Sequence, residues 1–255
     1  MKSLALAFVA ALAFGTMVQA DPVKMGVAAE PYPPFSSPDA NGTWVGWEID
    51  FMDAICKQAQ LDCVLTPTAW DGIIPALTSG QIDVIMSSMS MTAEREKTID
   101  FSDKYYATPV SAIAGKGLVA SPAPQAMKGK IMGVQVSTSQ EAYAQKYFAG
   151  VVAELKTYQT QDEVNQDLAA GRIDVMLMDA LPGADFLASA TGTSCCELLG
   201  SVADDPAILG RGTGFGLRKG DPLKDKLNAA IKAIRGDGVY KTLQGKYFDF
   251  DVYGK

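Results

Sequence analysis

Two stretches of the chain repeat one pattern, and they decide the fold class. The first is Ala76-Leu77-Thr78-Ser79-Gly80-Gln81-Ile82-Asp83-Val84-Ile85-Met86, and the second is Asp167-Leu168-Ala169-Ala170-Gly171-Arg172-Ile173-Asp174-Val175-Met176-Leu177. Each predicts a helix end, a Gly suited to a left-handed cap, and a buried strand. The separation of the two Gly residues exceeds the roughly 20–50 residues of a solenoid repeat. The repeat therefore predicts two similar lobes, each with its own sheet; a chance likeness of two strand–helix units is the alternative.

Strand-like apolar segments alternate with amphipathic helical segments along the chain, which is typical of parallel α/β structure. We expect strands at 23–29, 63–66, 82–86 and 131–136, and helices at 49–59 and 73–78. The segment 103–114 is expected to cross between the lobes, and 213–218 to return as a strand of the first lobe. A terminal helix follows, with Leu227, Ala230, Ile231 and Ile234 on one face. Two crossings make a hinge that can close a cleft. We predict a first lobe of residues 21–108 and 209–255, and a second lobe of residues 109–208.

The N-terminus has the features of a secretory signal peptide. Lys2 precedes an apolar segment over 4–18, and Val18-Gln19-Ala20 supplies the small residues of a cleavage site. We predict cleavage between Ala20 and Asp21, with export to the periplasm. A membrane anchor is the alternative, but about 15 apolar residues fall short of the roughly 20 that a span requires. No Cys lies at the cleavage point, which argues against a lipid anchor.

The composition excludes several classes of partner. The net charge of the chain is −7, and the predicted cleavage removes only one basic residue, Lys2. An acidic chain without a run of Lys and Arg is a poor match for nucleic acid or an anionic membrane. The chain contains no His, which is the commonest metal ligand and the usual general base. We expect no metal, no cofactor and no catalytic residue.

Four Cys remain after cleavage, and an exported protein can oxidise them. Three pairings are open. Cys56 and Cys63 form the natural staple between a helix end and the next strand, worth about 2.5 kcal/mol on the loop-entropy model. Cys195 and Cys196 are adjacent, and a bridge between them would be strained because neighbouring Cα atoms lie about 3.8 Å apart. The sequence assigns no role to that pair.

Three polar loops follow expected strands, at the edge where ligands bind in open parallel sheets. In the first, which contains Ser87, Ser88 and Ser90, Thr92 is expected to cap a helix and place Arg95 in its first turn. A cation there opposes the helix dipole, and a carboxylate partner would favour it. A local ion pair with a neighbouring acid is the alternative.

The second and third loops offer complementary charges. Ser137-Thr138-Ser139 leads from a strand into a helix, where free backbone N–H groups can bind an anion; simple N-capping is the alternative. Asp179 ends the strand that begins at Ile173, and it can hold an ammonium group or cap a helix. Together the three loops provide groups for both the carboxylate and the amine of an α-amino acid.

The first lobe adds aromatic and acidic candidates. Tyr32 in a Pro-rich loop and Trp70 are placed to sandwich a side chain, or to serve as core or rim aromatics. Glu30 and Glu48 lie near the same strand and helix ends. A buried acid beside aromatic rings favours a positively charged ligand tip, whereas a solvent-facing Glu is the ordinary alternative.

Motifs along nearly the whole mature chain resemble one family. They are Tyr32-Pro33-Pro34-Phe35, Gly46-Trp47-Glu48-Ile49-Asp50, Trp70-Asp71-Gly72-Ile73-Ile74-Pro75-Ala76-Leu77, Gly80-Gln81-Ile82-Asp83, Ser90-Met91-Thr92 with Arg95, Phe101-Ser102, Gly171-Arg172-Ile173-Asp174 and Lys246-Tyr247-Phe248-Asp249. The chain resembles the periplasmic polar amino acid-binding proteins of ABC importers, most of all the lysine/arginine/ornithine- and histidine-binding type. The resemblance implies a two-lobed periplasmic binding protein fold of type II, a monomer, and a membrane permease as partner.

The resemblance also implies roles for particular residues. Arg95, Ser90 and the Ser139 region match groups that hold a ligand carboxylate, and Asp179 with Ser88 matches groups that hold the ammonium. Tyr32 and Trp70 match aromatics that stack on the side chain, Glu48 matches an acid near a cationic tip, and the Cys56–Cys63 pair matches the cationic-ligand branch. This sequence departs at Ala29, where an acid is frequent and Glu30 is the adjacent substitute, and at Gln135 and Ser137 in the second-lobe wall.

The expected ligand is a polar, cationic amino acid (arginine, lysine, ornithine, histidine) or a derived opine. The candidate ligand-binding residues are Glu30, Tyr32, Glu48, Trp70, Ser87, Ser88, Ser90, Arg95, Gln135, Thr138, Ser139 and Asp179. An exported enzyme similar to cyclohexadienyl dehydratases is the alternative, and it would need Glu30 or Glu48 as a proton donor. A receptor ectodomain is disfavoured because no later segment is apolar enough to span a membrane.

Overall fold

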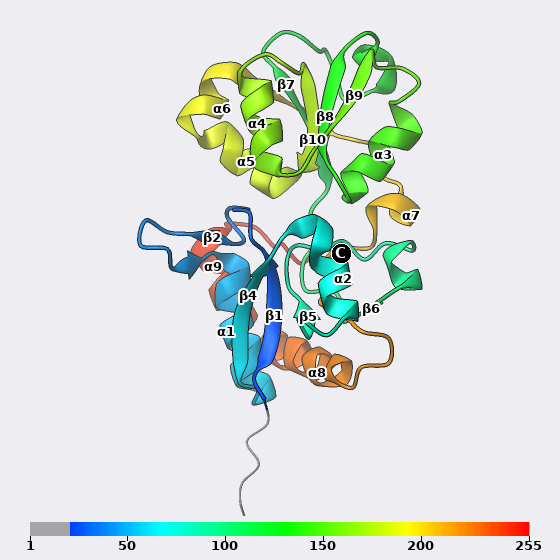
Figure 1. The fold of residues 1–255 in the computed structure, drawn as a ribbon. Coiled ribbons are helices and arrows are strands. Elements are labelled where there is room, and N and C mark those ends of the chain that lie inside the picture. Colours follow the sequence, from blue (N-terminus) through cyan, green and yellow to red (C-terminus); the bar gives the residue numbers. More distant parts are fainter. Residues whose placement is uncertain (1–20, 255) are drawn as a thin grey trace, which may run out of the picture.

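The computed structural model describes residues 21–254, which form two lobes stacked one above the other, each around a five-stranded sheet (Figure 1). The predicted signal peptide lies outside the described residues. Within residues 21–254, no helix has the length and apolar character needed to cross a membrane. No group of three or more Cys, Asp or Glu side chains in this range is placed to hold a metal ion.

The first lobe contains the sheet β4-β1-β5-β12-β6, in which β1 runs parallel to β4 and β5, whereas β12 runs antiparallel to β5 and β6. Its strands are β1 (Val23–Ala28), β4 (Cys63–Thr68), β5 (Val84–Ile85), β6 (Asp100–Phe101) and β12 (Gly216–Leu217), with a small hairpin of β2 (Ser37–Pro38) and β3 (Trp44–Val45). Its helices are α1 (Trp47–Ala59), α2 (Ile73–Thr78), α8 (Leu223–Gly236) and α9 (Val239–Tyr247), with 3₁₀ turns η1 (Trp70–Gly72) and η2 (Arg95–Lys97). The strand expected at 82–86 is shorter, and the helix expected after Thr92 is only the turn η2.

The second lobe contains the sheet β11-β7-β10-β8-β9, in which β8 runs parallel to β9 and β10, whereas β7 runs antiparallel to β10 and β11. Its strands are β7 (Val110–Gly115), β8 (Ile131–Gln135), β9 (Glu154–Tyr158), β10 (Val175–Asp179) and β11 (Cys196–Ser201). Its helices are α3 (Ser139–Tyr147), α4 (Gln161–Ala169), α5 (Ala180–Ala188), α6 (Ala190–Cys195) and α7 (Pro206–Leu209), with the 3₁₀ turn η3 (Pro124–Met127). The mixed α/β prediction is confirmed in both lobes.

The internal repeat appears as two matching strand–helix corners. Gly80 and Gly171 have φ values of 79° and 69° and follow α2 and α4, as the left-handed cap prediction required. Three residues after each Gly, an Asp ties the corner to the neighbouring parallel strand: Asp83 Oδ2 accepts from the Lys24 N–H at 3.0 Å, and Asp174 Oδ2 accepts from the Ile131 N–H at 2.8 Å. The two lobes therefore use the same local solution to start a buried central strand.

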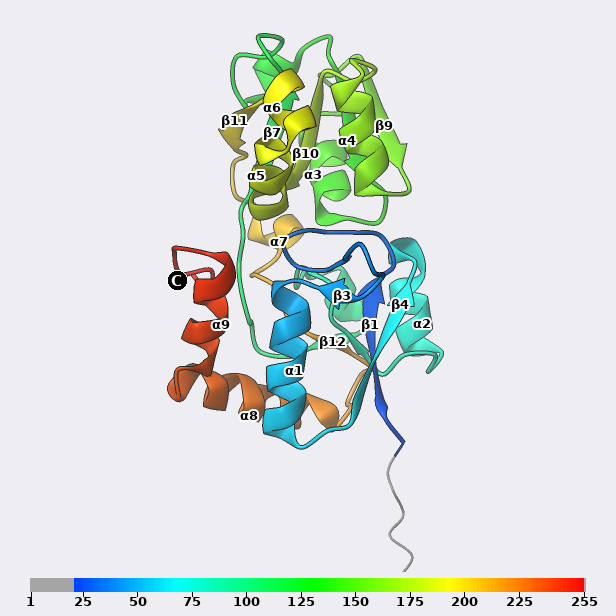
Figure 2. The same cartoon turned by 90° about the vertical axis from the view of Figure 1, so that its left-hand side faces the viewer.

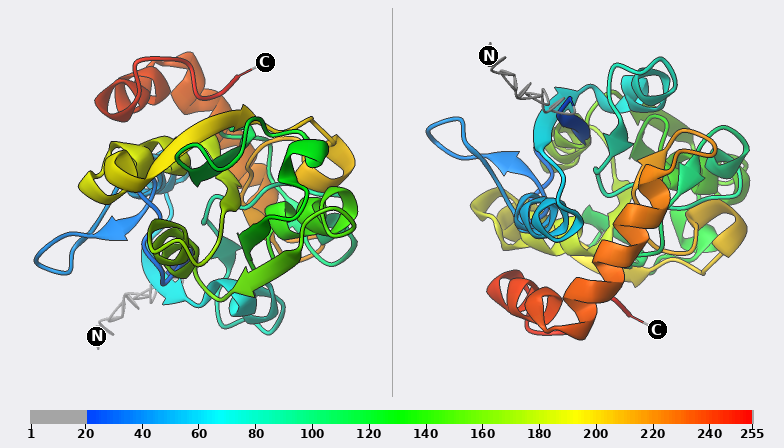
Figure 3. Two further views of the ribbon diagram at one scale, coloured as in Figure 1. Left: turned by 90° about the horizontal axis from the view of Figure 1, so that it is seen from above. Right: turned by 90° about the horizontal axis from the view of Figure 1, so that it is seen from below.

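Helices α1, α8 and α9 pack against one another in the core of the first lobe, and α8 crosses the base of that lobe when seen from below (Figure 3). The face of α8 that is buried consists of Leu227, Ala230, Ile231 and Ile234, the stripe predicted from the sequence. This packing leaves the opposite end of the sheet, where β1 and β5 end, facing the second lobe.

The chain passes between the lobes twice, once before β7 and once after β11 (Figure 2). The two passing segments pair with each other, because Tyr106 forms an antiparallel bridge with Thr213. The lobe boundaries at residues 108/109 and 208/209 stay a prediction.

Cys56 and Cys63 are joined, and so are Cys195 and Cys196. The first bridge closes the end of α1 onto the start of β4, next to the apolar core, since the Cys56 side chain is buried. It acts as the staple that the spacing predicted.

Replacing both Cys56 and Cys63 by Ser is expected to lower the free energy of unfolding by about 2.5 kcal/mol, because the bridge no longer restricts the unfolded chain. Urea unfolding of the mature protein followed by circular dichroism measures the change. The double replacement of Cys195 and Cys196 by Ser, which opens a much smaller loop, is the control and should cost about half as much on the same model. A loss below about 1 kcal/mol for the first pair would contradict the staple.

Candidate functional site

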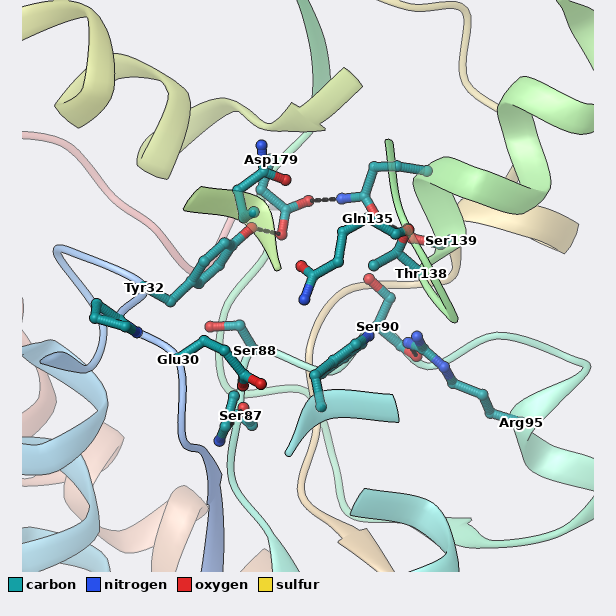
Figure 4. A pocket seen from close by; sticks show the side chains of 15 residues that line it. Glu30, Tyr32, Ser87, Ser88, Ser90, Arg95, Gln135, Thr138, Ser139 and Asp179 are labelled. Atoms are coloured by element: carbon teal, nitrogen blue, oxygen red, sulfur yellow. Dashed lines mark hydrogen bonds between the residues drawn. The ribbon is translucent and has the colours of Figure 1, made fainter. Parts of the chain in front are cut away.

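A pocket lies between the lobes, at the carboxyl ends of strands from both sheets (Figure 4). We call it the interlobe pocket. It is lined by Ala28, Glu30, Pro31, Tyr32, Trp70, Ser87, Ser88, Ser90 and Arg95 from the first lobe, and by Gln135, Thr138, Ser139, Gln140, Gln161 and Asp179 from the second. Every candidate residue from the sequence except Glu48 lines this pocket. In both lobes the pocket therefore lies where ligands bind in open parallel sheets, at the carboxyl ends of the strands.

Arg95 is held between the lobes by two backbone carbonyls. Its Nη1 donates to Ser90 O at 2.9 Å in its own lobe, and its Nη2 donates to Ser137 O at 3.0 Å in the second lobe. The guanidinium lies 5.3 Å from the centre of the Trp70 ring. Loss of solvent lowers the pKa of Arg95 to about 10, so the group stays charged at neutral pH. Thr92 is not the N-cap as predicted, since Glu94 takes that position without a side-chain capping bond, but Thr92 Oγ1 accepts from the Arg95 N–H at 3.2 Å.

Asp179 closes the opposite wall of the pocket. Its Oδ2 accepts from the Tyr32 hydroxyl at 2.9 Å, and its Oδ1 accepts from Gln140 Nε2 at 2.7 Å. The residue is the last of β10 and stands at the N-cap position of α5 without a side-chain capping bond. Burial raises the pKa of Asp179 to about 6, against the opposing effects of Tyr32, Arg95 and Gln140. A cationic group brought next to this carboxylate would favour its ionised form.

The start of α3 supplies donors on the second-lobe side. Thr138 is the N-cap, and its Oγ1 accepts from the Glu141 N–H and donates to Gln135 O. The first backbone N–H groups of a helix have no intrahelical acceptor, so those at Ser139 and Gln140 are suited to an anion. With Arg95 nearby, this helix start makes the pocket positive at one end, whereas Asp179 makes it negative at the other.

The lobes touch each other directly around the pocket. Tyr32 reaches from the first lobe to Asp179, and Trp70 Nε1 donates to Val136 O in the second lobe at 3.1 Å. Together with the Arg95–Ser137 bond, these contacts join side chains of one lobe to groups of the other. Tyr32 and Trp70 therefore combine pocket lining with interlobe bonding, a role that their sequence positions did not predict.

Glu48 differs from the sequence-based expectation. It is fully buried, does not line the pocket, and accepts hydrogen bonds from the backbone N–H and hydroxyl of Ser88 at 2.8 and 3.0 Å and from the Tyr105 hydroxyl. Burial raises the pKa of Glu48. Ser88 has a φ of 51°, in the left-handed region, and both its N–H and its hydroxyl are bonded to Glu48. Glu48 thus supports the pocket floor from behind instead of facing a ligand.

Glu30 lines the interlobe pocket, and its role beside a ligand tip stays a prediction. It lies at the pocket edge of the first lobe, opposite Gln135 across the pocket (Figure 4). Its Oε2 is buried, and among the described residues none donates a hydrogen bond to it. A buried carboxylate oxygen without a donor is costly, so a donor carried by a ligand would be favoured there.

Four residues that line the pocket were not among those predicted from the sequence, and two of these, Gln140 and Gln161, carry polar groups. Gln140 directly follows Ser139 in a loop already singled out, and its amide orients Asp179. Gln161 begins α4 just beyond β9, a strand that the sequence did not reveal because its residues are mostly half-buried and polar. Recognising β9 as a further parallel strand would have pointed to Gln161.

The family model for bacterial extracellular solute-binding proteins, family 3, matches residues 23–250. The chain belongs to this family. This family 3 protein is 38% identical to the histidine-binding periplasmic protein of Salmonella typhimurium over 260 residues, covering 100% of both chains. It is 41% identical to the lysine/arginine/ornithine-binding periplasmic protein of Escherichia coli over 225 residues, covering 88% of this chain and 86% of the relative.

A solved structure agrees with the fold. An ancestral arginine-binding protein bound to arginine superposes with a TM-score of 0.80 at 31% identity, covering 89% of this chain and 98% of the other. The predicted two-lobed fold of periplasmic binding proteins is therefore confirmed for this family 3 protein.

Asp179→Asn is expected to stabilise the ligand-free protein at pH 7 by about 1–3 kcal/mol, because the native pKa of the carboxyl is raised to about 6. An acid whose pKa is higher in the folded state than in the unfolded state stabilises the fold at pH values below its unfolded-state pKa. That contribution is lost as the pH rises through its folded-state pKa. The difference between variant and wild type should thus grow from pH 4 to pH 7. Urea unfolding at each pH measures it, with the exposed Asp204→Asn as control. An Asp179→Asn effect that does not vary with pH would contradict this assignment.

Proposed function

We propose that this protein captures a cationic amino acid in the periplasm and presents it to the membrane permease of an ABC importer. The arrangement of charges in the interlobe pocket supports this proposal most directly. Arg95 and the start of α3 suit a carboxylate, and Asp179 suits an ammonium group, so an α-amino acid is matched at both ends. The unpartnered Oε2 of Glu30 then adds a negative site beyond those two groups.

The charge balance favours a cation over a neutral or acidic amino acid. A ligand carboxylate compensates Arg95, and a ligand ammonium compensates Asp179. The acidic side chain of Glu30 then has no cationic partner among the described residues that line the pocket. A ligand with a positively charged side chain supplies that partner, whereas glutamate would bring a second negative charge to the same place. Arginine, lysine, ornithine, histidine or an opine derived from them fits this pattern.

Capture is proposed to work by closure of the lobes. The groups for the carboxylate come from both lobes, because Arg95 and Ser90 belong to the first and Ser139 to the second. Only a closed arrangement makes all of these contacts at once, so ligand binding favours closure. The closed form is what we expect the permease to recognise, with the binding protein acting as a monomer exported after cleavage near Ala20.

The dehydratase alternative is less well supported by the pocket. Such an enzyme needs an acid that reaches the substrate with its proton at neutral pH. Burial raises the pKa of Glu48, but the side chain lies behind Ser88 and does not line the pocket, so it does not reach a substrate there. The relatives described above are binding proteins, which agrees with a non-catalytic role.

A thermal-unfolding screen of the mature, ligand-stripped protein is expected to show a large shift with arginine, lysine, ornithine, histidine or an opine, and little with glutamate. A ligand at about a thousand times its Kd stabilises the folded state by about 4 kcal/mol, which corresponds to roughly 8–16 °C for a chain of this size. A shift with only neutral or acidic amino acids would refute the cationic preference. Turnover of prephenate in the same preparation would refute the non-catalytic role.

Glu30→Gln is expected to weaken binding of the preferred cationic amino acid by about 10- to 100-fold, because a charged hydrogen-bond partner is lost. Binding of glutamine should change less than threefold. Isothermal titration calorimetry gives both values, and Glu154→Gln, the same change at an exposed position of the second lobe, is the control. An equal loss for cationic and neutral ligands would show that Glu30 does not read the side-chain charge.

A further inference from the structure

Gln161 is a buried polar residue of the interlobe pocket whose position is firmly held. It is the first residue of α4, and only 8% of it is exposed. A capping box fixes this helix start: the Thr160 side chain accepts from the Glu163 N–H, and the Glu163 side chain accepts from the Thr160 N–H. The backbone around Gln161 is therefore set by local bonds, and its side chain is presented to the pocket from a rigid element.

The neighbours of the Gln161 amide determine which of its ends faces them. Its Nε2 lies 3.7 Å from the Met176 sulfur, 3.9 Å from the Met178 sulfur and 3.1 Å from Asn165 Oδ1. A thioether sulfur can accept a hydrogen bond but cannot donate one, so the nitrogen end of the amide belongs on the sulfur side. The carbonyl oxygen Oε1 is then left for the pocket, and no described residue donates to it.

Gln135 is oriented by the same rule. Its Nε2 donates to the backbone carbonyl of Gln159 at 3.1 Å, and a carbonyl also accepts only. Its Oε1 is therefore the atom available to a ligand, and among residues 21–254 no donor is bonded to it. Opposite, in the first lobe, Glu30 Oε2 is buried without a donor. The residues that line the interlobe pocket thus include three with an acceptor oxygen for a ligand: Gln161, Gln135 and Glu30.

We propose that Gln161 is a specificity-determining residue that selects a guanidinium group at the tip of the ligand side chain. This inference rests on the proposed function, since it assumes a cationic amino acid in the pocket. A guanidinium carries five N–H donors in a planar fork, whereas the lysine ammonium carries three on one compact centre and imidazolium carries two. A planar group with several donors can serve acceptors on both lobes at once. Arginine, or an opine that retains its guanidinium, satisfies all three oxygens, and the other cations leave at least one of them less well paired.

Gln161→Met tests the proposal because it removes Oε1 while keeping the length of the side chain, and a thioether packs well beside Met176 and Met178. Isothermal titration calorimetry with L-arginine and with L-lysine measures the selectivity. We expect arginine affinity to fall about tenfold or more, as for a hydrogen bond to a charged group, and lysine affinity to fall less than threefold. Octopine is a third ligand. Tighter binding of octopine than of arginine would indicate that the selected guanidinium belongs to an opine.

Gln166→Met is the matched control, since it makes the same change at an exposed position of the same helix. Gln161→Glu keeps an acceptor oxygen. Its affinity for arginine should therefore be about fivefold higher than that of Gln161→Met, or more. The inference is overturned if Gln161→Met reduces arginine and lysine affinity equally, or leaves arginine affinity unchanged. The proposed function fails separately, if the wild-type protein binds no cationic amino acid at all.

Discussion

The buried carboxylate of Asp179 is the group on which the arrangement of the pocket depends. It belongs to the last residue of β10 in the second lobe, yet one of its oxygens is bonded by Tyr32 of the first lobe and the other by Gln140. Removing an acid from water disfavours its charge, which is why its pKa lies near 6 instead of near its usual value. The protein thus tolerates an unfavourable buried acid at the contact between its lobes. An ammonium group would relieve that cost only when the lobes are together, so the same carboxylate can couple binding to closure.

The two lobes bring such groups together because they repeat one construction. In each, a Gly in the left-handed region ends a helix, an Asp ties the corner to the neighbouring strand, and a buried central strand follows. The central strands β5 and β10 then end at the facing edges of the lobes, where Ser87 and Asp179 lie. The site therefore consists of strand ends from two similar sheets that face each other, and neither lobe carries a complete set of groups for an amino acid.

The acids of the first lobe have separate tasks. Both carboxylate oxygens of Glu48 accept hydrogen bonds, from Ser88 and Tyr105, and these bonds hold Ser88 in its left-handed backbone conformation. Glu30, by contrast, has one buried oxygen without a donor. A buried acid that is already bonded contributes to the shape of a site and to its potential. One that lacks a donor, such as Glu30, is instead open to a donor carried by a ligand. The same division holds in the second lobe, where the amide of Gln140 is used by Asp179, while Gln135 and Gln161 retain free acceptors.

The sequence by itself determined the fold class of this protein and most of the residues that line the interlobe pocket. These features depend on local patterns: strand and helix periodicity, the Gly–Asp repeat, and polar residues placed just after buried strands. Tertiary structure alone decided that Glu48 lies behind Ser88, that Tyr32 and Trp70 bond across the lobes, and that Gln161 enters the pocket from beyond β9. The reason is physical: a residue position can be inferred from its neighbours along the chain, but the direction of a side chain and the partner that consumes its hydrogen bonds depend on packing between segments far apart in sequence.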